Sequence, residues 1–169
     1  AAHPREPWHR WPADLRRPDA PGVAEFALRD ARAVRFALYL QWLADRQLAA
    51  AANHARTAGL TLGFFRDLAV GAAPDGAEVW ANPGAFVRGV SVGAPPDPFS
   101  PAGQIWSLPP PNPEAMAGSA CAGFRDLVAA NMRHAGALRI DHVMGLSRLF
   151  WIPEGATAAE GAYVDYPFA

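Results

Sequence analysis

The chain has 169 residues, of which 51% are hydrophobic, so it is long enough to form one packed core. Its formal net charge of -1 excludes the strong basic excess that is typical of nucleic-acid-binding proteins. One cysteine, an N-terminus without the apolar core of a signal peptide, and no apolar run near ~18 residues together predict a cytoplasmic protein that spans no membrane.

The first half of the chain predicts a helix followed by a strand. Residues 1–22 are rich in Pro, Arg and Trp, which is typical of an irregular connection. Residues 24–58 contain neither Gly nor Pro, and their apolar side chains recur at three- and four-residue spacing, as in a helix. Gly59 follows at the position where helices end on glycine, and residues 60–70 predict a strand ending near Asp67. This succession indicates an α/β fold.

The second half repeats that order after a long interruption. Gly and Pro punctuate residues 71–113, which predicts a long loop with little regular structure. The aromatic residues of this loop argue against disorder, so we expect it to be functional. Residues 113–135 predict a second helix, residues 138–143 a second strand, and residues 145–169 another loop.

The second strand carries an arginine and an aspartate two positions apart. Arg139 and Asp141 therefore project from the same face of the strand. A guanidinium beside a carboxylate keeps the carboxylate ionised, and an ionised aspartate can act as a nucleophile toward an electrophilic carbon. From spacing alone, a structural Arg–Asp pair that orders the end of a strand is the commoner interpretation.

The residues around this pair resemble a known family. Arg139-Ile140-Asp141-His142, followed by Gly145, is similar to the signature that carries the nucleophile of 4-alpha-glucanotransferases of the amylomaltase type, glycoside hydrolase family 77. Matching blocks occur in family order between Phe36 and the end of the chain, namely Arg66–Gly71, Gly93–Asp97, Gly103-Gln104-Ile105-Trp106, Leu149–Pro153 and Gly161–Pro167.

The resemblance implies a partial (β/α)8 TIM barrel with long βα loops. A complete barrel typically takes ~250 residues, so residues 1–169 are expected to form part of one catalytic barrel, incomplete at both ends. Residues 71–113 would then be a loop insertion at the active site. The remainder of the parent enzyme would be needed to complete the barrel.

The resemblance also implies a set of site residues. Asp141 would be the nucleophile, and Arg139 would keep it ionised. Asp67 would support the site and bind sugar, or alternatively hydrogen-bond to loop amides. Trp106 would stack against a sugar, or alternatively anchor its loop to the core. Ser107 stands where many relatives carry glycine.

Three further residues are candidates for substrate binding. His142 would donate a hydrogen bond to substrate or act as a structural partner of the strand. Asp97 would hydrogen-bond to sugar hydroxyls or to its own backbone. Asp75 resembles a family aspartate, although it also fits a turn before a helix. The residue pattern predicts no metal site and no cofactor.

The implied reaction is the transfer of α-1,4-glucan segments between maltooligosaccharides by a retaining double displacement. None of the candidate glutamates, which are Glu78, Glu114, Glu154 and Glu160, matches the family's acid/base motif. The isolated chain is therefore predicted to be inactive. One alternative is an α-amylase-like retaining hydrolase, which lacks the Pro-Pro-Asp and Gly-Gln-x-Trp blocks. The other is a non-catalytic glucan-binding module, which has no need of the pair formed by Arg139 and Asp141.

Overall fold

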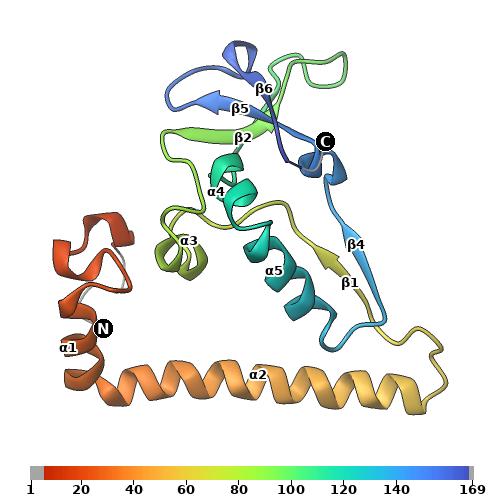
Figure 1. Cartoon of the computed structure of the whole chain (residues 1–169). Helices are drawn as coiled ribbons and strands as arrows, with labels where there is room; N and C mark the ends of the chain where they lie inside the picture. Colours follow the sequence, from red (N-terminus) through yellow and green to blue (C-terminus); the bar gives the residue numbers. More distant parts are fainter. Residues whose placement is uncertain (1–5, 168–169) are drawn as a thin grey trace. The chain divides into compact units, whose positions relative to one another are not determined.

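The computed structural model describes residues 6–167 (Figure 1). The chain divides into two compact units. The first unit comprises the chain up to Leu68 together with Val128–Arg139, and the second comprises Ala69–Leu127 and Ile140 onward. Helices and two β-sheets confirm the predicted mixture of α and β structure. Within the described residues, no helix combines the length and the apolar character needed to cross a membrane.

The first unit begins with four helical elements. Two 3-10 turns, η1 (Trp8–Arg10) and η2 (Ala13–Leu15), precede the helices α1 (Pro21–Arg29) and α2 (Ala31–Thr57). The single helix predicted for residues 24–58 is therefore wrong, because the chain breaks at Asp30, where φ is -104° and ψ is 30°. Aspartate favours such helix junctions, since its side chain competes with the helical backbone for hydrogen bonds.

The end of α2 confirms the prediction made for Gly59. This residue has a φ of +93°, which a side chain disfavours, and its N–H donates to the carbonyl of Arg56 at 3.0 Å. The N–H of Leu60 donates to the carbonyl of Ala55 at 3.1 Å. These two bonds form a Schellman motif, which satisfies carbonyl groups that the helix itself leaves without partners.

A salt-bridge cluster joins α2 to the residues that follow α5 (Ala122–Met132). Asp45 accepts from His134 Nε2 at 2.8 Å and from Arg133 Nη1 at 3.0 Å. The hydrogen bond from His134, followed by the interaction with Arg133, lowers the pKa of the Asp45 carboxyl. The cluster therefore favours the ionised carboxylate.

Strands β1 (Phe65–Leu68) and β4 (Ala137–Ile140) pair in a two-stranded sheet. Both strands are shorter than predicted, and the N–H of Gly63 instead closes a turn onto the carbonyl of Leu60 at 3.1 Å. Arg66 of β1 donates to the carbonyl of Asn131 at 3.2 Å, which ties the strand to α5.

The second unit contains a four-stranded antiparallel sheet in the order β3-β2-β5-β6. Its strands are β2 (Val90–Ala94), β3 (Gln104–Leu108), β5 (Arg148–Pro153) and β6 (Ala162–Asp165). The expectation of little regular structure in residues 71–113 is wrong, as is the loop predicted for residues 145–169. Each strand has only four to six residues and lies close to Gly or Pro. The local sequence therefore gave no clear strand signal, although distant segments pair to form a sheet.

Four short helices precede, follow or connect the strands of this sheet along the chain. They are α3 (Ala77–Ala81), α4 (Pro113–Gly118), η3 (Val143–Leu146) and η4 (Ala158–Glu160). The helix predicted for residues 113–135 is divided into α4 and α5. Ala120 and Cys121, between these helices, have positive φ angles of 47° and 58°, which no continuous right-handed helix contains.

Strand β5 packs on both of its faces. Leu149 belongs to one hydrophobic cluster with Val92 and Tyr166, whereas Phe150 and Ile152 belong to another. Successive side chains of a strand point to opposite faces, so β5 supplies both clusters. This double burial explains the continuous apolar run from 149 to 152.

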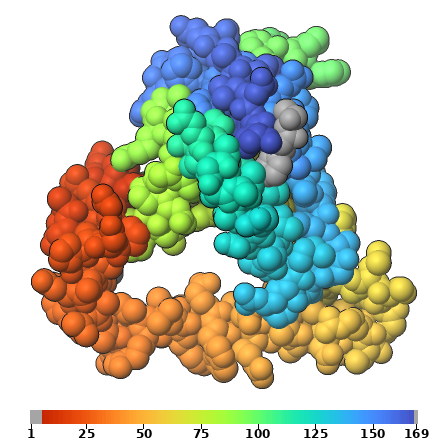
Figure 2. All heavy atoms as spheres, viewed as in Figure 1, coloured from red at the N-terminus to blue at the C-terminus, as the bar shows by residue number. Residues whose placement is uncertain are grey.

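Large apolar side chains are exposed on helix α2, which is the orange segment of Figure 2. Phe36 is 60% exposed, and Tyr39 and Trp42 stack on each other while remaining 51% and 57% exposed. The apolar periodicity that predicted this helix is therefore present, but these side chains do not enter a core within the described chain.

Candidate active site

The candidate nucleophile lies directly after strand β4. Asp141 is exposed and follows Ile140, the last residue of the strand. His142 then takes a left-handed conformation, with φ of 48° and ψ of 53°, and its carbonyl accepts from the N–H of Gly145 at 2.8 Å. This turn ends the extended backbone, so Asp141 stands at the point where the strand stops.

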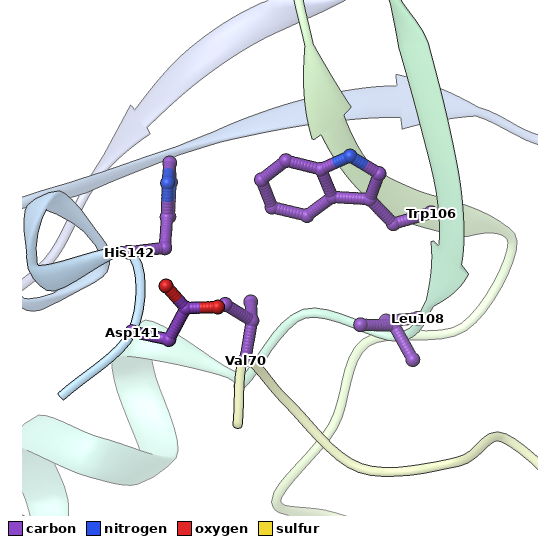
Figure 3. A pocket seen from close by; sticks show the side chains of 5 residues that line it. All are labelled: Val70, Trp106, Leu108, Asp141 and His142. Atoms are coloured by element: carbon purple, nitrogen blue, oxygen red, sulfur yellow. The ribbon is translucent and has the colours of Figure 1, made fainter. Parts of the chain in front are cut away.

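A pocket of about 350 Å³ in the second unit brings together three of the predicted site residues (Figure 3). Its lining residues are Val70, Trp106, Leu108, Asp141 and His142. In Figure 3 the carboxylate of Asp141 points into the space between the other side chains. The pocket thus combines an acidic group, an imidazole, an indole and two aliphatic side chains.

Trp106 is held in place by polar and aromatic contacts. Its Nε1–H donates to Gln104 Oε1 at 2.9 Å. Its ring lies 5.0 Å from the His142 ring, with an angle of 89° between the planes, which is a favourable edge-to-face arrangement. Figure 3 shows the edge of the indole directed toward the face of the imidazole.

The backbone position of Trp106 differs from the prediction. The residue lies on strand β3 and not on an irregular loop, and it packs against the cluster that contains Val92 and Leu149. Trp106 therefore anchors its strand to the core and also forms a wall of the pocket. The two interpretations made from the sequence are compatible with each other.

Asp67 and Arg139 form an ion pair in the first unit. Arg139 Nη1 donates to Asp67 Oδ2, which joins β4 to β1, and each side chain is more than half exposed. The structure thus brings together two more of the predicted residues. That Arg139 keeps Asp141 ionised stays a prediction.

Asp75 and Asp97 are absent from the described residues that line the pocket. Asp97 Oδ1 accepts from the backbone N–H groups of Phe99 and Ser100, both at 2.7 Å, so its carboxylate braces its own loop. Asp75 lies exposed in the turn before α3. A role in sugar binding stays a prediction for both aspartates.

Sequence reasoning missed the aliphatic walls and the support of the indole. Val70 and Leu108 line the pocket, and Gln104 holds the indole N–H. Ser107, which the resemblance places at a family glycine, has a φ of +57° in the structure. In residues 6–167, no group of three or more His, Cys, Asp or Glu side chains is placed to hold a metal ion.

The family of the chain follows from comparison with known proteins. The family model described as 4-alpha-glucanotransferase, glycoside hydrolase family 77, matches residues 1–169. The chain therefore belongs to the 4-alpha-glucanotransferase family.

Individual relatives carry the same name. The chain is 52% identical over 159 residues to the 4-alpha-glucanotransferase of Mycobacterium tuberculosis, covering 94% of this chain and 22% of the relative. It is 50% identical over 135 residues to that of Haemophilus influenzae, covering 80% of this chain and 19% of the relative. The chain thus spans about a fifth of the length of these curated relatives.

Two solved structures are similar to the chain. The amylomaltase of Corynebacterium glutamicum aligns with a TM-score of 0.75 and 42% identity, over 79% of this chain and 19% of that one. The amylomaltase of Streptococcus agalactiae in complex with acarbose aligns with a TM-score of 0.86 and 23% identity, over 96% and 34%. The second likeness concerns the fold alone.

Proposed function

We propose that the protein containing this chain is a 4-alpha-glucanotransferase that transfers α-1,4-glucan segments between maltooligosaccharides, and that this chain supplies the nucleophile, Asp141. The observation that carries the proposal is the exposed Asp141 carboxylate, directed into a pocket beside Trp106 and His142. The family match over the whole chain supports the same reaction.

We further infer that residues 1–169 form part of one (β/α)8 barrel. Strands β1 and β4 are hydrogen-bonded neighbours, and Asp67 and Asp141 lie at or just after their C-terminal ends. Functional residues of such barrels gather at this end of the strands and in the loops that follow them. Residues 71–113 would then be the segment that builds one side of the site.

The proposed reaction proceeds in two displacements. A carboxylate oxygen of Asp141 attacks the anomeric carbon, and the glycosidic C–O bond breaks as the ester bond forms. A second carboxyl group, which lies outside this chain and about 5–5.5 Å from the attacking carboxyl group, protonates the departing oxygen. An acceptor sugar hydroxyl then gives its proton back to that group and attacks the same carbon, which releases Asp141.

The pocket walls suit transfer to a sugar. The indole of Trp106 offers an apolar face to the C–H groups of a pyranose ring, and Val70 and Leu108 add aliphatic surface. A bound glucan over such walls excludes water, which favours a sugar hydroxyl as the acceptor. The ion pair between Asp67 and Arg139 orients the guanidinium that we assign to keep Asp141 charged.

The first test is the incubation of the full-length protein with maltotriose, followed by chromatography of the sugars. Glucose together with oligomers longer than maltotriose is the expected result. We expect Asp141→Asn to lower the rate by at least about a thousandfold, since removing a nucleophile disables the whole reaction. Asp126→Asn, at an exposed carboxylate on α5, is the matched control and should keep the parent rate.

Other outcomes of the maltotriose assay would indicate the alternative functions. Glucose and maltose without longer oligomers would indicate a hydrolase, and an inactive parent protein that still binds maltotriose would indicate a binding module. Parent-like activity in Asp141→Asn would contradict the assignment of the nucleophile. The isolated 169-residue chain is expected to be inactive in the same assay, because its partner carboxyl group is absent.

A further inference from the structure

We propose that Ser107 is a positioning residue, and that its left-handed backbone sets the place of Trp106 in the pocket. This inference rests on the proposed function, because it concerns how the indole meets the substrate. It assigns a role to a bulge in strand β3, which neither the motif nor the reaction explains by itself.

The bulge is visible in the register between β2 and β3. Val92 pairs with Leu108, whereas the next residue, Gly93, pairs with Ile105. The register therefore passes over two consecutive residues of β3, Trp106 and Ser107. A continued regular ladder from Gly93 and Ile105 would place Trp106 opposite Val92, in the position that Leu108 occupies.

The two-residue bulge removes Trp106 from the pairing with β2. The side chains on either side of the bulge still point to the same faces of the sheet as in a regular strand. Because two residues are inserted, the alternation of side chains is the same before and after the bulge. Leu108 and Trp106 therefore both pack against the cluster around Val92, and both line the pocket. Bulges often redirect a side chain in this way beside functional sites.

Ser107 closes the bulge at an energetic cost. Its φ of +57° lies in the left-handed region, which disfavours any residue that carries a side chain. Glycine, which has no Cβ atom, adopts this conformation freely. Among the described residues, four non-glycine positions have positive φ, and two of them, Ser107 and His142, adjoin Trp106 in sequence or by ring contact.

Two left-handed residues adjoin the indole. Ser107 fixes the backbone directly after Trp106, and His142 presents the imidazole face to the indole edge. The hydrogen bond to Gln104 fixes the remaining rotation of the ring. A change in the backbone at Ser107 would move the indole away from both contacts, and Asp141 would keep its own place after β4.

The test compares Ser107→Val with Ala120→Val in the full-length protein. Both changes put a β-branched residue at a positive φ, but Ala120 lies between α4 and α5 and is absent from the described lining of the pocket. We expect Ser107→Val and Ala120→Val to lose similar thermal stability. Only Ser107→Val should also lower kcat/KM for maltotriose disproportionation, by at least about tenfold. Ser107→Gly, which accepts the conformation, should retain far more activity than Ser107→Val.

A second comparison separates positioning from general damage. In a Trp106→Ala background, Ser107→Val should lower kcat/KM by less than about twofold further, because the indole that it displaces is already gone. An equal loss in both backgrounds, or an equal loss in Ala120→Val, would overturn the proposal. If Ser107→Val does not fold, Ser107→Ala applies the same test with a smaller strain. A parent protein without disproportionation activity would instead refute the proposed function.

Discussion

At the scale of single residues, the buried side chain of Tyr166 joins two segments of the second unit. Tyr166 is only 3% exposed, and its hydroxyl donates to the carbonyl of Pro111 at 2.7 Å. Burial raises the pKa of this phenol to about 12. Tyr166 also packs with Val92 and Leu149, against which Trp106 rests, so it supports the wall of the site from behind.

The Tyr166 hydroxyl leads to a prediction at neutral pH. We expect Tyr166→Phe to lower the free energy of unfolding by about 1 kcal/mol, because the carbonyl of Pro111 loses a partly buried hydrogen bond. Denaturant unfolding of the full-length protein measures this difference. Tyr163→Phe is the matched control, since Tyr163 is 47% exposed on the same sheet, and an equal loss there would contradict the reasoning.

The same side chain predicts a pH dependence. The pKa of Tyr166 is higher in the folded protein than its ordinary value of 10, so folding favours the neutral phenol. Its contribution to stability is therefore fully present below pH 10 and is lost as the pH rises through about 12. The parent should lose stability more steeply than Tyr166→Phe across this interval. Parallel curves would contradict the prediction.

At the scale of elements, the sheet of the second unit depends on close backbone contact. A Cβ atom added at Gly93 of β2 would overlap the carbonyl oxygen of Gln104 on β3 and the Cδ1 atom of Ile152 on β5. The glycine of this motif is thus required by the spacing of three strands. The bulge that carries Trp106 begins at the same residue, so sheet packing and site geometry are linked.

Gly93→Ala is expected to lower the free energy of unfolding by about 1–3 kcal/mol, the usual range for an overpacked core. Gly123→Ala is the control, because Gly123 lies in α5 with open space around it and alanine is the better helix former. We expect that control to be neutral or stabilising by up to about 1 kcal/mol. Thermal unfolding of both variants measures whether stability falls in Gly93→Ala and is unchanged or rises in Gly123→Ala. Unchanged stability in Gly93→Ala would refute the packing argument.

At the scale of the whole molecule, the chain leaves much apolar surface uncovered. Leu28 is 81% exposed and Leu38 is 63% exposed, in addition to the aromatic side chains of α2. Phe65 of strand β1 is 69% exposed. Large exposed apolar patches mark surfaces that associate with other protein segments. This agrees with a chain that spans about a fifth of its curated relatives.

We predict that the isolated 169-residue chain associates or precipitates near neutral pH. Replacing the stacked pair Tyr39 and Trp42 by glutamate should reduce the association, because it places charge on the exposed face of α2. Sedimentation velocity measures both results. A cooperative, monodisperse monomer of the parent sequence would contradict this prediction.

The sequence alone determined the features that depend on local pattern. It predicted the helical character of residues 24–58, the glycine that ends α2, and a strand leading directly to Asp141. The motifs around Asp141 and Trp106 indicated the family, which the family model confirms. These features are readable because helix periodicity, helix ends and motif spacing involve residues that are close in the chain.

The tertiary structure decided the antiparallel sheet, the bulge and the pocket. Strand β2 pairs with β5, which lies far along the chain, so no local pattern specified that Val92 faces Trp151. The left-handed backbone of Ser107 follows from hydrogen bonds and packing between strands, which overrode the local preference of serine. Trp106 of β3 meets His142 in the turn after β4, and no local pattern places these two residues together because they lie far apart in the chain.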